Sequence, residues 1–141
     1  MSSAGRKIRM GFVGGGEGAF IAQAHRQAAR LDGQFELVCG AFSRTPENNQ
    51  RTAAALGVPA QRCYETWQAM LDAESVLAPE QRMELLVIVT PNHLHAPIAS
   101  KALRAGFHVF SEKPAALDLA ELQSLRHDVI HSDRIYGLAH T

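Results

Sequence analysis

Short apolar runs alternate along this chain with longer segments that have one apolar face. The runs end at glycine, proline or polar residues, which is typical of strands buried on both sides of a sheet. Strands are expected at residues 8–13, 35–42, 85–89, 107–111 and 135–139. Helices are expected at residues 19–31, 46–56, 64–73, 97–105 and 117–130, with a polar loop at residues 74–82.

Local signals mark several helix boundaries. The alanine-rich segment 19–31 carries apolar residues on one side, which predicts an amphipathic helix: Phe20, Ala24, Ala28 and Leu31. Thr45 followed by Pro46 indicates a helix start, with Thr45 at the N-cap. Gly57 indicates the end of that helix, because glycine tolerates the left-handed conformation in which helices commonly stop.

The order of the elements predicts the fold class. Strands separated by helices form βαβ units with right-handed crossovers. We therefore expect an α/β fold with a doubly wound parallel sheet, as a single domain over residues 7–141 after an N-terminal tail at residues 1–6. Ligands of such sheets bind beyond the carboxyl ends of the strands, so the residues that follow each strand are the candidates for chemistry.

The first expected strand is followed by a glycine-rich segment, Gly14-Gly15-Gly16-Glu17-Gly18-Ala19. It fits the pattern G-x-G-x-x-A at Gly14, Gly16 and Ala19. These residues permit a tight turn, a close approach to a pyrophosphate and close packing of helix on strand. The next helix would offer free N–H groups to phosphate. A glycine loop without a ligand is the alternative, but the strand–loop–helix context favours a nucleotide site, with Gly18 as part of it.

The next strand leads into Ser43-Arg44. At this point a cofactor with a free ribose 2′-hydroxyl usually meets an acidic side chain. A guanidinium can instead bind a 2′-phosphate and stack on adenine. The pair therefore favours NADP over NAD. The alternative is that Ser43 caps a turn and Arg44 is a solvated surface charge.

The strand at residues 85–89 is followed by Thr90-Pro91-Asn92-His93-Leu94-His95. The side chains of Thr90 and Asn92, with nearby carbonyls, suit hydrogen bonds to a ribose or a carboxamide. His93 and His95 could suggest a metal site, but no third ligand is apparent, so we expect no bound metal. Either histidine can instead start the next helix. His25, inside the first expected helix, is interpreted as a packing or hydrogen-bonding residue rather than a catalyst.

The strand at residues 107–111 is followed by Glu112-Lys113-Pro114. A lysine at this edge, next to a nicotinamide, could hydrogen-bond a substrate hydroxyl and help its deprotonation. A lysine considered alone is most often a solvated surface charge. The neighbouring motifs are therefore what make Lys113 a catalytic candidate.

Composition excludes other classes of function. Fourteen Lys and Arg residues balance fourteen Asp and Glu residues, which gives no basic surface for nucleic acid or an anionic membrane. No apolar run is long enough to span a membrane. Cys39 and Cys63 lie far apart without metal-ligand spacing, so we expect reduced thiols and a cytoplasmic location.

Together these motifs resemble the N-terminal Rossmann domain of the glucose-fructose oxidoreductase/inositol 2-dehydrogenase (Gfo/Idh/MocA) family, over about residues 7–141. The resemblance rests on Gly14–Ala19, Ser43-Arg44, Thr90-Pro91-Asn92 with His95, and Glu112-Lys113-Pro114. It implies that these residues bind NAD(P) and that Lys113 is catalytic and touches the nicotinamide ribose. It also implies a sugar, inositol or related polyol as the small-molecule substrate of the oxidoreductase.

Family members carry a second, C-terminal domain with the substrate pocket and usually an Asp and a His that act with the lysine. This chain ends at Thr141, where that domain would begin. We therefore expect a cofactor-binding domain of a longer, homo-oligomeric dehydrogenase, which alone binds cofactor with little or no turnover. Surface left uncovered by the missing domain would favour weak self-association.

Two other functions stay open at this point. One is a nucleotide-binding regulatory module without catalysis. The other is a methyltransferase-like domain whose glycine loop binds S-adenosylmethionine. Ser43-Arg44 argues against the latter, because such folds usually place an acidic residue there, and Glu112-Lys113-Pro114 would have no role in it.

Overall fold

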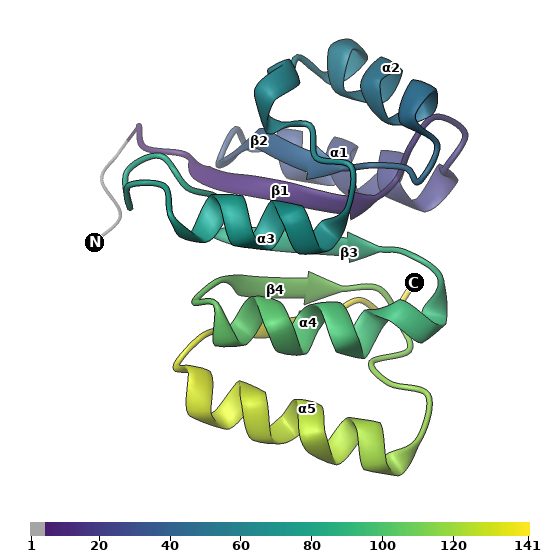
Figure 1. Ribbon diagram of the computed structural model, residues 1–141, viewed down its shortest axis with the longest axis vertical. Coiled ribbons are helices and arrows are strands. Elements are labelled where there is room, and N and C mark those ends of the chain that lie inside the picture. The colour runs from purple at the N-terminus through teal and green to yellow at the C-terminus, as the bar shows by residue number, and fades with distance from the viewer. Residues whose placement is uncertain (1–4) are drawn as a thin grey trace.

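In the computed structural model, which describes residues 5–141, five parallel strands form one sheet in the order β2-β1-β3-β4-β5 (Figure 1). The strands are β1 (Ile8–Gly14), β2 (Phe35–Ala41), β3 (Leu85–Val89), β4 (His108–Ser111) and β5 (Tyr136–Leu138). The helices are α1 (Phe20–Arg30), α2 (Pro46–Leu56), α3 (Trp67–Ser75), α4 (His95–Arg104) and α5 (Leu119–Ser132), with short 3-10 turns η1 (Ala60–Arg62) and η2 (Asn92–Leu94). The doubly wound α/β class is confirmed. Of the expected tail, residues 1–4 lie outside the described residues, and Arg6 pairs with Glu84.

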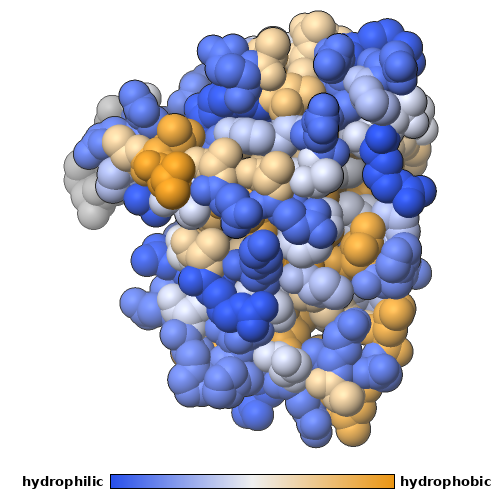
Figure 2. Space-filling model, in the orientation of Figure 1, coloured by the Kyte–Doolittle hydropathy of each residue, from blue (hydrophilic) through white to orange (hydrophobic). Residues whose placement is uncertain are grey.

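The helices cover the two faces of the sheet unequally. α3, α4 and α5 pack on one face, the one toward the viewer in Figure 1, and α1 and α2 pack on the other. Right-handed crossovers explain the division, because the steps from β2 to β3, β4 and β5 run in one direction and the step from β1 to β2 runs in the opposite one. Helix α2 shares the face of α1 because the chain after it first forms a parallel bridge, Gly40 with Cys63, on the outer side of β2, which continues the direction from β1 to β2. Hydrophilic side chains predominate on the side seen in Figure 2.

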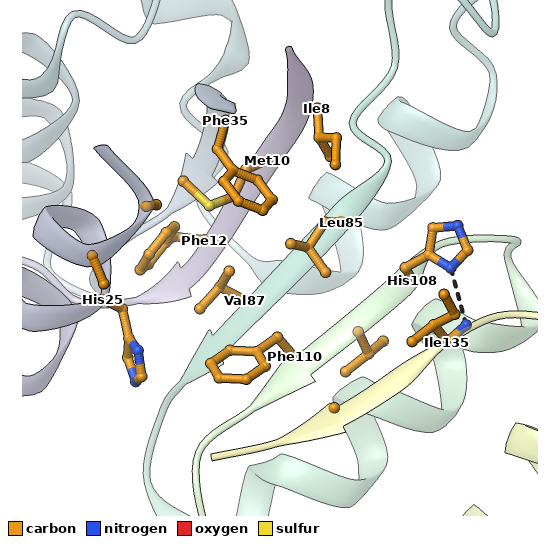
Figure 3. A pocket seen from close by; sticks show the side chains of 14 residues that line it. Ile8, Met10, Phe12, His25, Phe35, Leu85, Val87, His108, Phe110 and Ile135 are labelled. Carbon is orange, nitrogen blue, oxygen red and sulfur yellow. Dashed lines mark hydrogen bonds between the residues drawn. The ribbon is translucent and has the colours of Figure 1, made fainter. Parts of the chain in front are cut away.

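The face that carries α1 is left partly uncovered. A groove of about 530 Å³ runs beside α1 over β1, β3, β4 and β5 (Figure 3). Its lining is almost entirely apolar and includes Met10, Phe12, Leu85, Val87 and Phe110. Parallel sheets normally have both faces covered. We call this feature the apolar groove.

Helix α1 forms as expected but buries a different side. Phe20 is 81% exposed and Leu31 is 88% exposed. The residues that contact the sheet layer are instead Ala22, His25, Arg26 and Ala29. Alanine occurs on several sides of this helix, so its sequence pattern does not single out one of them, and contacts with Phe12 and Phe110 decide.

The prediction of a polar loop at residues 74–82 is wrong at its start, because Glu74 belongs to α3 and is fully buried. Its carboxylate accepts hydrogen bonds from Arg62 at 2.6 Å, the Tyr64 hydroxyl at 2.8 Å and the Met83 amide at 2.9 Å. Burial, with the hydrogen bond to Glu74, raises the pKa of Tyr64. A charged residue is tolerated inside because each of its oxygens has donors.

Candidate cofactor site

The carboxyl edge of β1, β3 and β4 brings three of the predicted motifs together. Gly14 pairs with Val89, and Ile88 pairs with Ser111. The glycine loop, the Thr90 segment and the Lys113 turn therefore leave the sheet from adjacent strands. A cavity of about 510 Å³ opens at this edge and is lined by, among others, Gly14, Gly15, Ser43, Arg44, Glu65, Trp67, Thr90, Pro91 and His93.

The glycine loop depends on the absence of side chains. Gly14 has a φ of +83°, and a Cβ there would lie 2.7 Å from the Val89 carbonyl oxygen. A Cβ on Gly16 would lie 3.1 Å from the Asn48 side chain and 3.2 Å from the Phe42 carbonyl oxygen. The Gly16 amide also donates to that oxygen at 2.9 Å. The loop therefore lies directly against the ends of β2 and β3.

The N-terminus of α1 lacks a side-chain cap. Its N-cap residue is Ala19, which has no side-chain acceptor. The N-caps of α2 and α4 also make no side-chain capping bond, whereas Thr66 caps α3 by accepting from the Ala69 amide at 3.0 Å and Asp118 caps α5 by accepting from the Glu121 amide at 2.8 Å. The first amides of α1 are thus left for an acceptor from outside, and an anionic phosphate fits their partial positive charge.

The only carboxylate in the glycine loop is bound to α2. The Glu17 amide donates to Asn48 Oδ1 and Thr52 Oγ1, both at 3.0 Å, and its side chain pairs with Arg51 at 3.0 Å. These contacts hold the charge of Glu17 against a cation of α2. They reduce its repulsion of a phosphate at the loop.

The segment after β2 contributes both polar residues that the sequence suggested. Ser43 Oγ accepts from the Thr45 amide at 3.1 Å, so it does cap a turn. Thr45 occupies the N-cap of α2, but its side chain makes no capping bond. Arg44 lines the cavity and has no ion pair within residues 5–141. Glu65, just before α3, lines the same cavity and was missed because it lies outside the segment that follows β2.

Some residues of the segment after β3 line the cavity, and others are buried in the interior. Thr90, Pro91 and His93 line the cavity, and Asn92 is exposed at the start of η2. His95 is only 1% exposed, and its ring nitrogens lie 2.8 Å from the carbonyl oxygens of Thr90 and Pro114. It therefore joins two loops of the site from behind. Among the described residues, no group of three or more His, Cys, Asp or Glu could hold a metal ion.

The turn after β4 combines a buried carboxylate with an exposed amine. Glu112 is 8% exposed, and its carboxylate accepts from His25, from Thr141 and from the Lys113 amide. Burial raises the pKa of Glu112, but these hydrogen bonds outweigh it and hold the pKa below its usual range. Lys113 itself is exposed at the carboxyl edge, with no ion pair in the described part of the chain.

A doubly wound sheet with a glycine loop leading into an uncapped helix defines a dinucleotide-binding domain. The sequence model of the Gfo/Idh/MocA family, an oxidoreductase family with an NAD-binding Rossmann fold, matches residues 8–140. The chain belongs to this family. No helix among residues 5–141 is long and apolar enough to cross a membrane.

Known proteins resemble this chain over nearly its whole length. An uncharacterised oxidoreductase of Bacillus subtilis is 34% identical over 96% of this chain and 34% of its own length. A solved inositol dehydrogenase homologue from Azotobacter vinelandii, complexed with NAD+, is 36% identical, with a TM-score of 0.90 over 96% of this chain and 34% of that one. The same homologue has been solved with NADH and myo-inositol.

Biliverdin reductase from Synechocystis, solved with biliverdin and NADP+, is 32% identical, with a TM-score of 0.76 over 94% of this chain and 38% of that one. This chain therefore spans roughly a third of the length of the relatives it matches.

Proposed function

We propose that this chain is the cofactor-binding domain of an NAD(P)-dependent oxidoreductase that acts on a hydroxyl or carbonyl group of a sugar, inositol or related polyol. The observation that carries the proposal is the meeting, at one sheet edge, of the uncapped α1 N-terminus with the exposed Lys113. The inositol dehydrogenase homologue, solved with NADH and myo-inositol, supports the substrate class.

The residues at the carboxyl edge of the sheet have two kinds of role, cofactor binding and proton exchange with the substrate. The first amides of α1 and the loop from Gly14 to Ala19 hold the pyrophosphate. Thr90 and Asn92, with nearby carbonyls, would hydrogen-bond the ribose or the carboxamide. When bound, the nicotinamide supplies the carbon that accepts or gives the hydride. Lys113 hydrogen-bonds the reacting oxygen of the substrate and exchanges a proton with it. Glu112, Pro114 and His95 hold the backbone around Lys113.

NADP is the favoured cofactor in this proposal. Arg44 lies on the cavity with Ser43 beside it, and a guanidinium is suited to a 2′-phosphate. Glu65 on the same cavity is the feature that favours NAD, because a carboxylate can accept from a ribose hydroxyl. The cofactor preference of this cavity therefore depends on which of the two side chains, Arg44 or Glu65, contacts the ribose, and it can be measured.

Chemistry on a polyol also needs residues that hold the substrate carbon against the nicotinamide. The chain spans about a third of its relatives, so we propose that it binds cofactor with little or no turnover by itself and works within a longer, homo-oligomeric cytoplasmic enzyme. Lys113 favours this proposal over a regulatory module, which has no use for an amine at the nicotinamide end.

Thermal unfolding with NAD+, NADH, NADP+, NADPH and S-adenosylmethionine tests the proposal. A ligand at about 100 times its Kd stabilises the native state by about 2.7 kcal/mol, which shifts Tm by roughly 5–10 °C for a domain of this size. We expect the larger shift with NADP+ and NADPH. A shift only with NAD+ and NADH would overturn the NADP preference alone. A shift only with S-adenosylmethionine, or none with any nicotinamide cofactor, would overturn the proposed function.

A further inference from the structure

Adjacent residues of α1 are bonded to both ends of the candidate site. Arg26 donates from Nη1 to the Gly15 carbonyl oxygen at 3.1 Å, which ties α1 to the glycine loop. The next residue toward the N-terminus, His25, donates from Nε2 to Glu112 Oε1 at 2.7 Å. Helix α1 therefore links the loop that would hold phosphate with the turn that carries Lys113.

Glu112 connects His25 to the backbone of Lys113 through its two carboxylate oxygens. While Oε1 accepts from His25, Oε2 accepts from the Lys113 amide at 3.2 Å and from the Thr141 hydroxyl at 3.1 Å. The Glu112 amide also donates to the Ile88 carbonyl at 3.0 Å, which fixes the residue to β3. A carboxylate held by this many donors has little freedom, so it defines where the Lys113 peptide lies.

The His25 ring is itself fixed. Its side chain is 15% exposed, and it meets the Phe110 ring edge to face, with centroids 5.4 Å apart and planes at 86°. Figure 3 shows His25 reaching from α1 to the end of the apolar groove, near Phe110. Because this packing orients the imidazole, the direction of its N–H toward Glu112 is set before any ligand binds.

The far side of the turn is held separately. His95 lies 2.8 Å from the Pro114 carbonyl oxygen and 2.8 Å from that of Thr90. The backbone of Lys113 is therefore restrained by α1 through Glu112 and by α4 through His95, while its side chain stays exposed. Within residues 5–141, the hydrogen bond between His25 and Glu112 is what connects the turn to α1, the helix that follows the glycine loop.

We infer that His25 is a positioning residue: through Glu112 it sets the place of Lys113 relative to the glycine loop, so that one bound dinucleotide reaches both. The inference rests on the proposed function, since it takes Lys113 as the group at the nicotinamide end. It goes beyond that function by giving a role to a helix residue that contacts neither cofactor nor substrate. If the pair served only to stabilise the fold, its loss would lower Tm without changing how Lys113 meets the cofactor.

The test uses the three lysines of the chain, Lys7, Lys101 and Lys113. Reductive methylation with ¹³C gives each amine one NMR signal, and a Lys113→Arg variant assigns that of Lys113. The informative pair is His25→Gln, which can still donate to Glu112, and His25→Leu, which fills similar space beside Phe110 but cannot donate. His127→Leu, at an exposed histidine of α5, is the control. Each protein is titrated with NADP+ and NAD+, and its Tm is measured without cofactor.

In the wild-type chain and in His127→Leu, we expect cofactor to move the Lys113 signal and to leave those of Lys7 and Lys101 in place. His25→Leu should bind cofactor through the glycine loop with a Kd weakened by no more than about tenfold, roughly the net effect of one ordinary hydrogen bond. Its Lys113 signal should no longer move. His25→Gln should restore the movement.

Equal movement of the Lys113 signal in the Leu and Gln variants, whether of wild-type size or none, would overturn the inference, because donation to Glu112 would then be irrelevant. So would a His25→Leu variant that stays folded but binds no cofactor. The proposed function fails in a different way: the wild-type chain would then bind no nicotinamide cofactor, or bind it without moving Lys113.

Discussion

Replacing Gly14 by alanine tests whether the sheet itself shapes the glycine loop. The added Cβ would lie 2.7 Å from the carbonyl oxygen of Val89 and 2.9 Å from its carbonyl carbon. Both atoms belong to the backbone of β3, which is held in the sheet and cannot rotate away as a side chain can. The contact is relieved only if β1 and β3 separate at the edge where the cavity opens.

Gly18 supplies a matched comparison, because its φ is +90° but an added Cβ would meet nothing within 4 Å. An alanine in the left-handed region costs about 1–2 kcal/mol, which is the whole expected effect of Gly18→Ala. Gly14→Ala carries the same cost plus about 1–3 kcal/mol for forcing atoms into a packed site. At about 3–4 °C for each kcal/mol, Tm should fall by about 3–8 °C in Gly18→Ala and by about 6–20 °C in Gly14→Ala.

The assay is thermal unfolding of the two variants and the wild-type chain at the same concentration, followed by circular dichroism. Urea unfolding gives the free-energy difference independently, provided that the slope against urea is unchanged. If Gly14→Ala unfolds at the same temperature as Gly18→Ala, or higher, the close approach of β1 and β3 does not constrain the loop and the reasoning is refuted.

Three further changes test other parts of the structure. Arg44→Ala should weaken NADP+ binding about tenfold or more and leave NAD+ binding nearly unchanged, as isothermal titration can show; an equal loss for both would contradict a contact with the 2′-phosphate. Wild-type protein should self-associate through the apolar groove as concentration rises in sedimentation velocity, because Ile135 is 72% exposed there and a net charge of zero offers no repulsion, and Ile135→Lys should reduce this. Sedimentation that does not change with concentration would count against the groove as a contact surface. Glu112→Gln should lower the free energy of unfolding by about 1–3 kcal/mol at pH 7. Because the folded-state pKa of Glu112 is lowered, its contribution is present above the unfolded value of about 4.3 and is lost as the pH falls through the folded value, so the difference should shrink toward pH 3 in urea unfolding. A difference that is the same at both pH values would be evidence against an ionised Glu112 in the fold.

The strands were predictable because their burial leaves a direct mark on the sequence. The apolar run Leu85–Val89 is β3 without change, since a strand covered by other residues needs apolar side chains at successive positions. Gly57 ends α2 with a φ of +75°, as its position in the sequence indicated. These features depend on neighbours in the chain, so a local pattern is enough to find them.

Features that depend on residues far apart in the sequence could not be predicted from a local pattern. Glu74 was expected to begin a polar loop, because its donors Arg62 and Met83 are brought to it only by the fold. The sequence gives His25 no catalytic pattern, and its partner Glu112 lies 87 positions further along the chain.

The candidate site shows the same limit. The glycine loop, Ser43-Arg44, the Thr90 segment and the Lys113 turn could be proposed from their places after strands, and the fold gathers those places at one edge. Glu65 and Trp67 come from the long connection between β2 and β3, where no local rule points to a ligand. His95 could be singled out, but its burial behind the cavity follows from the way that α4 packs on the sheet.

Strand β1 is synthesised before the other four strands but lies inside the finished sheet, between β2 and β3. It pairs with β2 on one side and with β3 on the other, and β3 begins at Leu85, roughly seventy residues after Gly14. At about 5–20 residues per second, the nascent strand waits roughly 4–14 s for its second neighbour. Throughout that time Phe12, fully buried in the finished fold, belongs to an apolar strand with an unpaired edge, the kind of segment that pairs with other chains. The interval between the synthesis of β1 and that of β3 is therefore a period in which this edge is open to pairing with other chains.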